Sequence, residues 1–472
     1  MIRTTLLLLV VIFFSFYAWR NWFVSTCAAI LLMAVVQHPD FPNTMLGIQG
    51  LNPWNILLFS IILAWLSQRQ AEGLVWDVPA KVSWMFLGFF GVIVVGVIRL
   101  LIKAPPEFTV GTILSEQLIN SIKWVIPGLL LFDACRTRRR VTTALVVVLV
   151  LYLLLALEAI RYMPLGYAIS GEDLAGRASK TIETRMGYNR VNLSMLLAGA
   201  CWAILTTWIL VQRNLYRLAI LAAAGAVALG QALTGGRTGY VTWAAVGLAL
   251  SLVRWRRFLP FIPIAIIFVA IFLPGVRDRM LQGFGGREGN VIVNTSVHDI
   301  TSGRNVAWPR VIKEIEKAPL FGYGRAAMVT TGLRDELWDD LGESFPHPHE
   351  AYLEQLLDNG IVGFLLVMPI YFFVLFRSFR LLLDRSDPLV CAVGSASFAL
   401  VLALLLGSFG AQTFYPREGS VGMWAAIGIM LRVFVERSRS LAFGGPIFPD
   451  DEPFADEEAE AASSLTGESV PI

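Results

Sequence analysis

The sequence has little charge and few of the residues that usually carry chemistry. Charged residues make up 15% of its 472 residues, against about a quarter in soluble domains. There are four histidines and four cysteines, and the cysteines lie in or beside apolar runs without metal-ligand spacing, as packing residues do. The net charge is only +3 and the arginines are scattered through loops, so no basic face for nucleic acid is expected.

Long apolar runs are what the sequence has in abundance. Hydrophobic residues make up 56% of the chain, and the mean hydropathy is +0.65. Because a spanning helix needs roughly 20 mostly apolar residues, we predict an all-α polytopic membrane protein, a bundle of about 11–13 transmembrane helices with one large extracytoplasmic loop containing amphipathic helices. The candidate spans centre on residues 4–18, 22–36, 52–67, 83–102, 121–133, 141–160, 191–211, 216–234, 239–253, 258–274, 360–376, 388–407 and 421–435.

Basic loops indicate how the bundle is oriented. From residue 136 onward every second loop is rich in arginine, which marks the cytoplasmic side. The other loops then face outward, at residues 161–190, 234–238, 275–359 and 408–420. We therefore expect four regions, namely the N-terminal and central transmembrane helices (1–274), the large extracytoplasmic loop (275–359), the C-terminal transmembrane helices (360–440) and an acidic, disordered cytoplasmic tail (441–472).

The long outer loop places an arginine at the start of an expected helix. Ser302 is a candidate helix cap, and Arg304 follows it in the first turn. The apolar face of this amphipathic helix is expected to comprise Val306, Val311, Ile312 and Ile315. An arginine there does not complement the helix dipole, but it can share an anion with free backbone N–H groups. Arg304 is therefore either a surface residue or part of an anion site.

A second arginine lies in a tight outer turn. The sequence LTGGRTGY (residues 233–240) joins two long apolar helices, and its glycines allow close backbone approach. Arg237 in this turn must snorkel or find an anionic partner, because an uncompensated charge near hydrocarbon is costly. The alternatives are an interfacial anchor and a clamp in which the guanidinium holds phosphate oxygens bidentately.

Two of the four histidines precede a predicted helix in FPHPHEAYLEQLLDNGIVG (residues 345–363). The prolines keep the approach extended, so a helix can begin near His349. The helix dipole there disfavours an imidazolium and favours the neutral imidazole that a general base needs. Ordinary polar surface is the alternative. A metal site with His347 and His349 is a weaker one, because no third ligand set accompanies them.

The motifs around these residues occur in the same order as motifs of a known family. GGRTGY (235–240), SGRNVAW (302–308), APLFGYG (318–324) and HEAYLEQLLDNGIVG (349–363) together resemble the O-antigen ligase/polymerase superfamily, the Wzy/WaaL-type bacterial envelope glycosyltransferases. GYNRVNLS (187–194), which contains Asn189, looks like the family's loop-to-helix entry. The resemblance covers about residues 185–435. His349 and Tyr352 fit the family spacing, whereas Glu350 stands where the family usually has asparagine.

The resemblance implies a function and roles for these residues. The donor would be a glycan on undecaprenyl diphosphate, its diphosphate bound by Arg237 and Arg304, while His349 orients or deprotonates an acceptor hydroxyl. His347, Glu350, Asn189 and Tyr352 would be accessory. The reaction would be inverting and would need no metal or other cofactor.

The resemblance also implies a location and partners. It places a multi-pass enzyme in the bacterial inner (cytoplasmic) membrane, among membrane lipids, with its active site on the periplasmic face. The acceptor stays open among a growing glycan (O-antigen or exopolysaccharide polymerase), lipid A core (ligase of lipopolysaccharide biosynthesis) and a protein side chain (O-oligosaccharyltransferase). The alternative from another class is a non-enzymatic polysaccharide or lipid transporter, which would show broken helices and repeat symmetry. The sequence shows no internal repeat.

Overall fold

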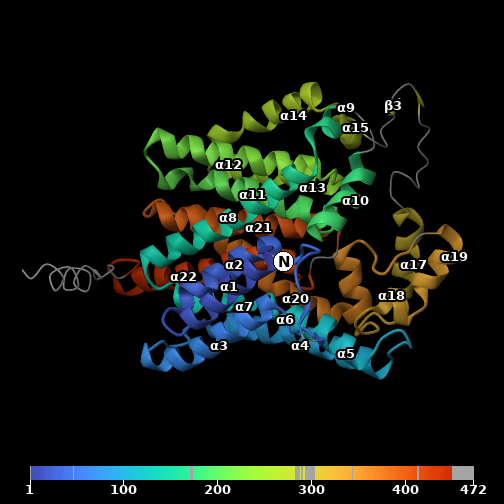
Figure 1. Ribbon diagram of the computed structural model, residues 1–472, viewed down its shortest axis with the longest axis horizontal. Helices are drawn as coiled ribbons and strands as arrows, with labels where there is room; N and C mark the ends of the chain where they lie inside the picture. The colour runs from blue at the N-terminus through green and yellow to red at the C-terminus, as the bar shows by residue number, and fades with distance from the viewer. Residues whose placement is uncertain are drawn as a thin grey trace, which may run out of the picture.

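The protein is an all-α membrane bundle with minimal strand structure (Figure 1). The structure, a computed structural model, describes residues 2–45, 47–170, 174–281, 287–288, 291–292, 303–342, 344–411 and 414–448. In this part of the chain, four two-residue strands form two antiparallel ribbons, β1 (Thr44–Met45) with β2 (Ile48–Gln49) and β3 (Arg287–Glu288) with β4 (Val291–Ile292). The predicted fold class is confirmed.

Seven helices of the described residues are long and apolar enough to cross a membrane. They are α4 (Ala80–Ile102), α8 (Arg138–Tyr162), α11 (Arg190–Thr206) continued by η2 (Thr207–Leu210), α12 (Asn214–Leu233), α20 (Ala351–Leu382), α21 (Pro388–Gly407) and α22 (Val421–Phe443) preceded by η4 (Glu418–Ser420). An eighth span is counted if the pair bent by 109°, η3 (Arg256–Phe258) and α14 (Phe261–Phe272) with α15 (Pro274–Leu281), is one crossing.

The other expected spans are helical but shorter or less apolar than a full crossing needs, so the count of about 11–13 is not reached by length and composition. These helices are α1 (Ile2–Tyr17), α2 (Trp22–Val36), α3 (Pro53–Ala71), α7 (Ile126–Ala134) and α13 (Arg237–Val253). Still shorter or more polar elements are α5 (Val110–Thr112), η1 (Ile113–Ile119), α6 (Asn120–Lys123), α9 (Leu165–Ser170), α10 (Leu174–Met186), α17 (Arg304–Lys317), α18 (Ala327–Thr330) and α19 (Leu333–Leu341).

The bundle has two chemically different ends. Helices α17, α18 and α19 gather at one end, on the right in Figure 1, and α22 runs toward the other. At that other end, ion pairs join the arginine-rich loops to one another, Arg138 to Asp387 and Arg437 to Asp384. We call this the basic end. The helix α22 continues to Phe443, past the expected start of the tail at 441, and residues 449–472 lie outside the described residues.

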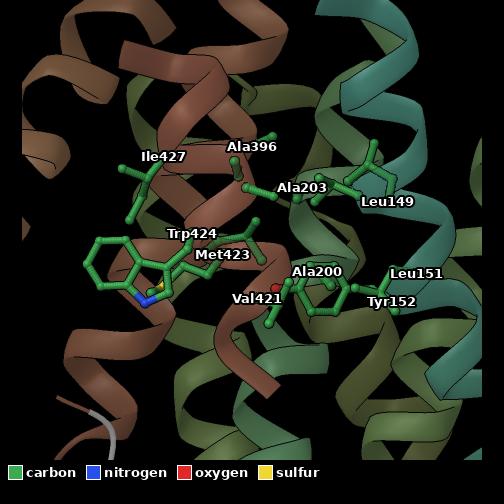
Figure 2. Close-up of a cluster of buried hydrophobic side chains, with 14 of the residues drawn as sticks. Leu149, Leu151, Tyr152, Ala200, Ala203, Ala396, Val421, Met423, Trp424 and Ile427 are labelled. Atoms are coloured by element: carbon green, nitrogen blue, oxygen red, sulfur yellow. The ribbon is translucent and has the colours of Figure 1, made fainter. Parts of the chain in front are cut away.

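The centre of the bundle is built from α8, α11, α21 and α22, which approach closely because small residues lie between them. Figure 2 shows Tyr152 of α8 beside the start of α22, near Val421. A Cβ on Gly422 would lie 2.7 Å from the Tyr152 hydroxyl, and one on Gly428 would lie 1.9 Å from the Gly128 carbonyl oxygen. Such contacts replace the hydrophobic driving force that lipid does not supply.

The longest helix, α20, is interrupted at Gly360. Gly360 has φ 63° and ψ −170°, and the chain 319–324 lies in the break. The backbone N–H groups of Ile361 and Val362 donate to the carbonyls of residues 319 and 320, while those of residues 323 and 324 donate to the carbonyls of Leu357 and Asp358, all at 2.7–3.1 Å. A Cβ on Gly360 would lie 2.4 Å from the Leu320 carbonyl carbon. Glycine is therefore required at this crossing.

Helix α17 lies where the sequence predicted an amphipathic helix, but one residue assigned to its apolar face, Ile312, is not buried. Ala307 and Val311 are its buried residues, whereas Ile312 is 45% exposed. Residues 307 and 311 are one helical turn apart and therefore lie on the same face of α17. Ile312 is one residue further along, which rotates its side chain away from that face. Ser302, the expected cap, lies outside the described residues; Gly303, in the left-handed conformation, precedes the helix.

Candidate functional site

His347 and His349 line one polar cavity of about 280 Å³, at the end of the bundle opposite the basic end. The cavity lies between the start of α11, the start of α17, the approach to α20 and the loop after α21. His347, His349, Arg304 and Arg417 are among its lining residues. None of its described lining residues is a carboxylate, so its walls favour an anionic ligand.

Helix α20 begins directly after His349, and Glu350 caps it. The Glu350 carboxylate accepts hydrogen bonds from the backbone N–H groups of Tyr352 and Leu353, as an N-cap residue does. Burial raises the pKa of Glu350, while the two backbone hydrogen bonds act in the opposite direction. The side chain found in place of the family's usual asparagine therefore has a structural role in this chain.

His349 is held in an unusual backbone conformation. Its φ is 54°, a left-handed value rare for residues other than glycine. The backbone N–H of His349 donates to Nδ1 of His347 at 3.2 Å, and the indole N–H of Trp308 donates to the carbonyl oxygen of Pro348 at 3.0 Å. The Ala351 N–H donates to the Ser408 carbonyl at 2.8 Å. These contacts hold the backbone that carries His349 at the cavity wall.

Both imidazoles are neutral at physiological pH. Burial, and then the charge of Arg304, lowers the pKa of His349 to about 4. Burial, the neighbouring His349 and the charges of Arg417, Arg325 and Arg304 lower the pKa of His347 to about 2. Because Nδ1 of His347 accepts the His349 N–H, its lone pair is already used. His349 is the better placed of the two to accept a proton.

Arg304 lies in the first turn of α17 and projects into the cavity wall. One terminal nitrogen donates to the Gly410 carbonyl at 3.4 Å, while its buried Nε has no hydrogen-bond partner in the described part of the chain. Burial lowers the pKa of Arg304, and the charges of Arg237 and Arg190 lower it further. Three guanidinium groups therefore act on one another here, and their combined positive charge favours an anion nearby.

Arg237 does not line this cavity, but its turn adjoins it. It is the first residue of α13, after Gly236. Arg190 and Arg279 both donate to the Gly235 carbonyl, at 3.0 and 3.1 Å. A Cβ on Gly410, the residue that accepts from Arg304, would lie 2.3 Å from the Thr238 hydroxyl. The structure thus brings the two expected clamp arginines into one electrostatic group with Arg190, with His349 beside it.

Two residues expected to be accessory also have structural roles. Asn189 caps α11, because its side-chain oxygen accepts from the backbone N–H groups of residues 191 and 192, although it also lines the cavity. The Tyr352 hydroxyl donates to the Leu405 carbonyl at 2.8 Å, and its ring packs against Phe409 and Phe414. Tyr352 does not line the cavity.

Sequence reasoning missed Arg417. Its guanidinium lines the cavity and has no hydrogen bond or ion pair with any described residue. Its backbone is fixed, because its N–H donates to the Ser420 hydroxyl, which in turn donates to the Arg417 carbonyl. Burial lowers its pKa. The one sequence signal was an arginine in the predicted outer loop 408–420, and no motif singled it out.

A buried ion cluster supports the segment that carries Arg417. Arg325 pairs with Glu354 and Asp358 of α20, at 3.3 and 3.4 Å, and lies 3.3 Å from the centre of the Tyr415 ring. The Tyr415 hydroxyl donates to Asp358 at 2.9 Å and accepts from Asn359 at 2.7 Å. This network ties the loop after α21 to the interrupted helix α20.

A second cavity adjoins the first. It measures about 310 Å³, and Asn189, Asn192 and Arg417 line both cavities. Its other lining residues include the carboxylates Glu183 and Glu418 and the tyrosines 188 and 415. Among the described residues, no three or more His, Cys, Asp or Glu side chains come close enough together to hold a metal ion.

One family comparison covers the centre of this site. Residues 222–368 match the sequence model of the family described as O-antigen ligase, a range that includes Arg237, Arg304 and His349 but not Arg190 or Arg417. No curated protein matches the chain. The family suggests an enzyme of the glycosyltransferase type. The match covers about a third of the chain and, together with the seven candidate spans, supports the resemblance of this multi-pass membrane protein to the O-antigen ligase/polymerase superfamily.

Proposed function

We propose that the protein transfers a glycan from undecaprenyl diphosphate to an acceptor hydroxyl at the outer face of the cytoplasmic membrane. The observation that carries this proposal is a neutral histidine in a cavity that contains arginines and no described carboxylate. Such a site fits a diphosphate leaving group and a hydroxyl nucleophile. Membrane lipids surround the protein, and no metal or nucleotide is assigned a part in the reaction.

The arginines would bind the diphosphate of the donor. Arg304, with Arg237 and Arg190, provides planar donors that can hold phosphate oxygens in pairs. Their charge stabilises the negative charge that develops on the diphosphate as the anomeric C–O bond breaks. Undecaprenyl diphosphate is the leaving group.

His349 would accept the acceptor's proton. The hydroxyl oxygen attacks the anomeric carbon from the side opposite the leaving oxygen, so the configuration inverts, and the hydroxyl proton passes to the imidazole of His349. The histidines share the cavity wall with Arg304 and Arg417, and the charges of both arginines act on His347. We call Arg304 and Arg417 the two cationic poles of the cavity. We assign the Arg304 pole to the donor. The Arg417 pole, where the second cavity begins, is assigned to the acceptor.

The second cavity is suited to a saccharide acceptor. Its amides, carboxylates and tyrosine rings offer hydrogen-bonding groups and flat apolar faces for sugar rings. A growing glycan or the sugar of lipid A core would make the protein a polymerase or a ligase, whereas a protein hydroxyl would make it an O-oligosaccharyltransferase. Deleting the gene and recording whether glycan chain length, lipid A attachment or protein glycosylation changes would identify the acceptor.

The test of the proposal is a transfer assay with the full-length protein in membrane vesicles. Labelled undecaprenyl-diphosphate glycan is the donor, and release of undecaprenyl diphosphate and transfer of the label are both measured. The wild type and the control Arg310→Gln, which alters a partly exposed arginine of α17 paired with Asp340, should transfer the label. The variant His349→Ala should not. Equal transfer by His349→Ala would contradict the mechanism.

A further inference from the structure

A second group of arginines surrounds a larger cavity at the basic end of the bundle. The cavity measures about 970 Å³ and lies among the ends of α11, α12, α13 and α20. Five arginines line it, Arg217, Arg254, Arg256, Arg257 and Arg385, and no described lining residue is acidic. Like charges repel, so an anion in the space between these arginines would be bound favourably.

The arginines of this cavity have no acidic partners in the described structure. Arg217 Nε donates to the Val211 carbonyl at 3.2 Å, and an Arg254 nitrogen donates to the Leu383 carbonyl at 3.5 Å. None of the five is in an ion pair with a described residue. Backbone carbonyls satisfy single N–H groups but do not neutralise the charge.

The acidic residues of the adjacent loop are already used. Asp384 accepts from Arg437 at 2.7 Å, and Asp387 accepts from Arg138 at 2.6 Å. Both partners come from other helices and do not line the cavity. The positive charge of the cavity is therefore not cancelled by the two aspartates that follow α20.

Tryptophan rings hold two of the guanidinium groups in place. Arg217 and Arg257 lie 5.4 and 5.3 Å from the centre of the Trp208 ring, and Arg257 also lies 5.0 Å from the Trp255 ring. Stacking fixes a guanidinium while its in-plane N–H groups remain available to phosphate oxygens. Tryptophan is also the residue enriched at the level of lipid headgroups.

The helix surfaces beside the cavity are apolar and exposed. Leu215 and Leu218 of α12 are 74% and 63% exposed, and Leu252 of α13 is 56% exposed. Acyl chains can cover these side chains, whereas a soluble phosphate or nucleotide would leave them bare. A ligand that has an anionic head and apolar chains satisfies both parts of the surface.

We propose that this cavity binds the headgroup of an anionic phospholipid from the leaflet at the basic end of the bundle. Its phosphate oxygens lie among the five arginines, and its acyl chains run along α12 and α13. Basic pockets between transmembrane helices bind such headgroups. The proposal is independent of the transfer reaction, because none of these residues lines the cavities at the other end.

Binding is tested with the full-length protein purified in a mild neutral detergent. Native mass spectrometry counts retained phospholipids, and thermal unfolding is followed with added phosphatidylglycerol, cardiolipin, phosphatidylcholine or inorganic phosphate. We expect retained anionic lipid and a higher Tm with phosphatidylglycerol or cardiolipin only. Arg217→Gln and Arg257→Gln should each weaken lipid binding about 5-fold, and the double variant by roughly 25-fold.

Arg213→Gln is the matched control. Arg213 is exposed and directly precedes α12, one turn before Arg217, but it does not line the cavity, so this variant changes the net charge equally. It should bind lipid as the wild type does. Should the double variant fail to fold, the single variants carry the test. Equal loss in Arg213→Gln, no loss in the cavity variants, or equal stabilisation by inorganic phosphate would overturn the assignment to a phospholipid.

Discussion

The arginines around His349 and those around Asp77 are arranged in opposite ways. At the basic end, Asp77 pairs with Arg432 at 2.7 Å and with Arg439 at 2.6 Å, and Arg432 also pairs with Glu436. Around His349, the described cavity wall contains arginines and no carboxylate. The same residue type therefore stabilises the fold where acids accompany it, and provides a binding charge where they are absent.

The arginines around Asp77 change the pKa of its carboxylate. Burial alone would raise the pKa of Asp77, but hydrogen bonds and charge from Arg432, with the charges of Arg136 and Arg439, lower it to about 2. A lowered carboxylate pKa stabilises the fold above the unfolded value of 3.8, and the stabilisation is lost as the pH falls from 3.8 through 2. No carboxylate lines the described wall of the cavity at His349 in the same way.

The largest expected effect is at the proposed reacting centre of the cavity, His349. Replacing His349 with alanine removes the proton acceptor, so transfer should fall by about 10²- to 10⁴-fold. The amount of folded protein in the membrane should not change, because the helix cap is provided by Glu350. His347→Ala should lose less activity. The transfer assay with both variants measures the difference, and a larger loss for His347→Ala would reverse the roles of the histidines.

Variants of Arg304 test whether this site needs the bidentate geometry of a guanidinium in addition to its positive charge. Arg304→Gln should lower transfer by about 10²- to 10³-fold, since a preorganised donor to the leaving group is lost. Arg304→Lys keeps the charge but not the bidentate geometry, and should recover only part of the activity. Arg310→Gln is the control on the same helix. Full activity of the lysine variant would reduce the role of Arg304 to simple charge.

Replacing Asp77 is expected to lower the stability of the fold without lowering the transfer activity. Asp77→Asn leaves the buried Arg432 without its aspartate, which should destabilise the fold by about 3 kcal/mol. Thermal unfolding in detergent measures this loss. Transfer per folded molecule should stay at the wild-type value, because Asp77 lies at the end opposite the cavity. Lower kcat with unchanged Tm would contradict the distinction between the arginines around Asp77 and those around His349.

A variant of Arg417 tests whether Arg417 and Arg304 have different roles, in binding the acceptor and the donor. Arg417→Gln should lower glycan transfer about 10- to 100-fold by removing a charged hydrogen bond to the acceptor. Binding of inorganic diphosphate, followed by thermal shift, should be retained in this variant and lost in Arg304→Gln. If both variants lose diphosphate binding equally, Arg417 belongs to the donor clamp.

The smallest expected effect is a shift in the pH profile. Because the pKa of His349 is lowered from 6.5 to about 4, its imidazole stays neutral from neutral pH down to about 4. The kcat/KM should therefore fall only as the pH drops through 4. Arg304→Gln removes one of the two causes and should move this limb toward 6.5. An acidic limb near 6.5 in the wild type would contradict a buried base.

The sequence predicted the helices better than it predicted how they cross. Apolar periodicity placed α2 and α21 at residues 22–36 and 388–407, as the structure has them. It could not show that several apolar runs form helices too short for a full crossing, because helix ends depend on tertiary partners. The break at Gly360 was also missed, since its cause is a chain segment some forty residues earlier.

For the candidate site, motifs identified the residues but not their partners. His349, Arg304 and Arg237 were found from order and spacing, and the structure brings them into one electrostatic group. Arg417 was missed because an arginine without partners looks the same in a sequence as one with partners. The cap formed by Glu350 was also missed. Its role follows from where the helix begins, which spacing alone does not fix within a residue.

The interruption of α20 imposes an order on assembly. The part after Gly360 is long enough to cross the membrane alone, at roughly 20 residues. The part before it completes its backbone hydrogen bonds only with residues 319–324. The last helices can therefore enter the bilayer early, but the end of the bundle that carries His349 is finished only once residues 319–324 have folded back against α20. A complete candidate site therefore requires that this later folding step has taken place.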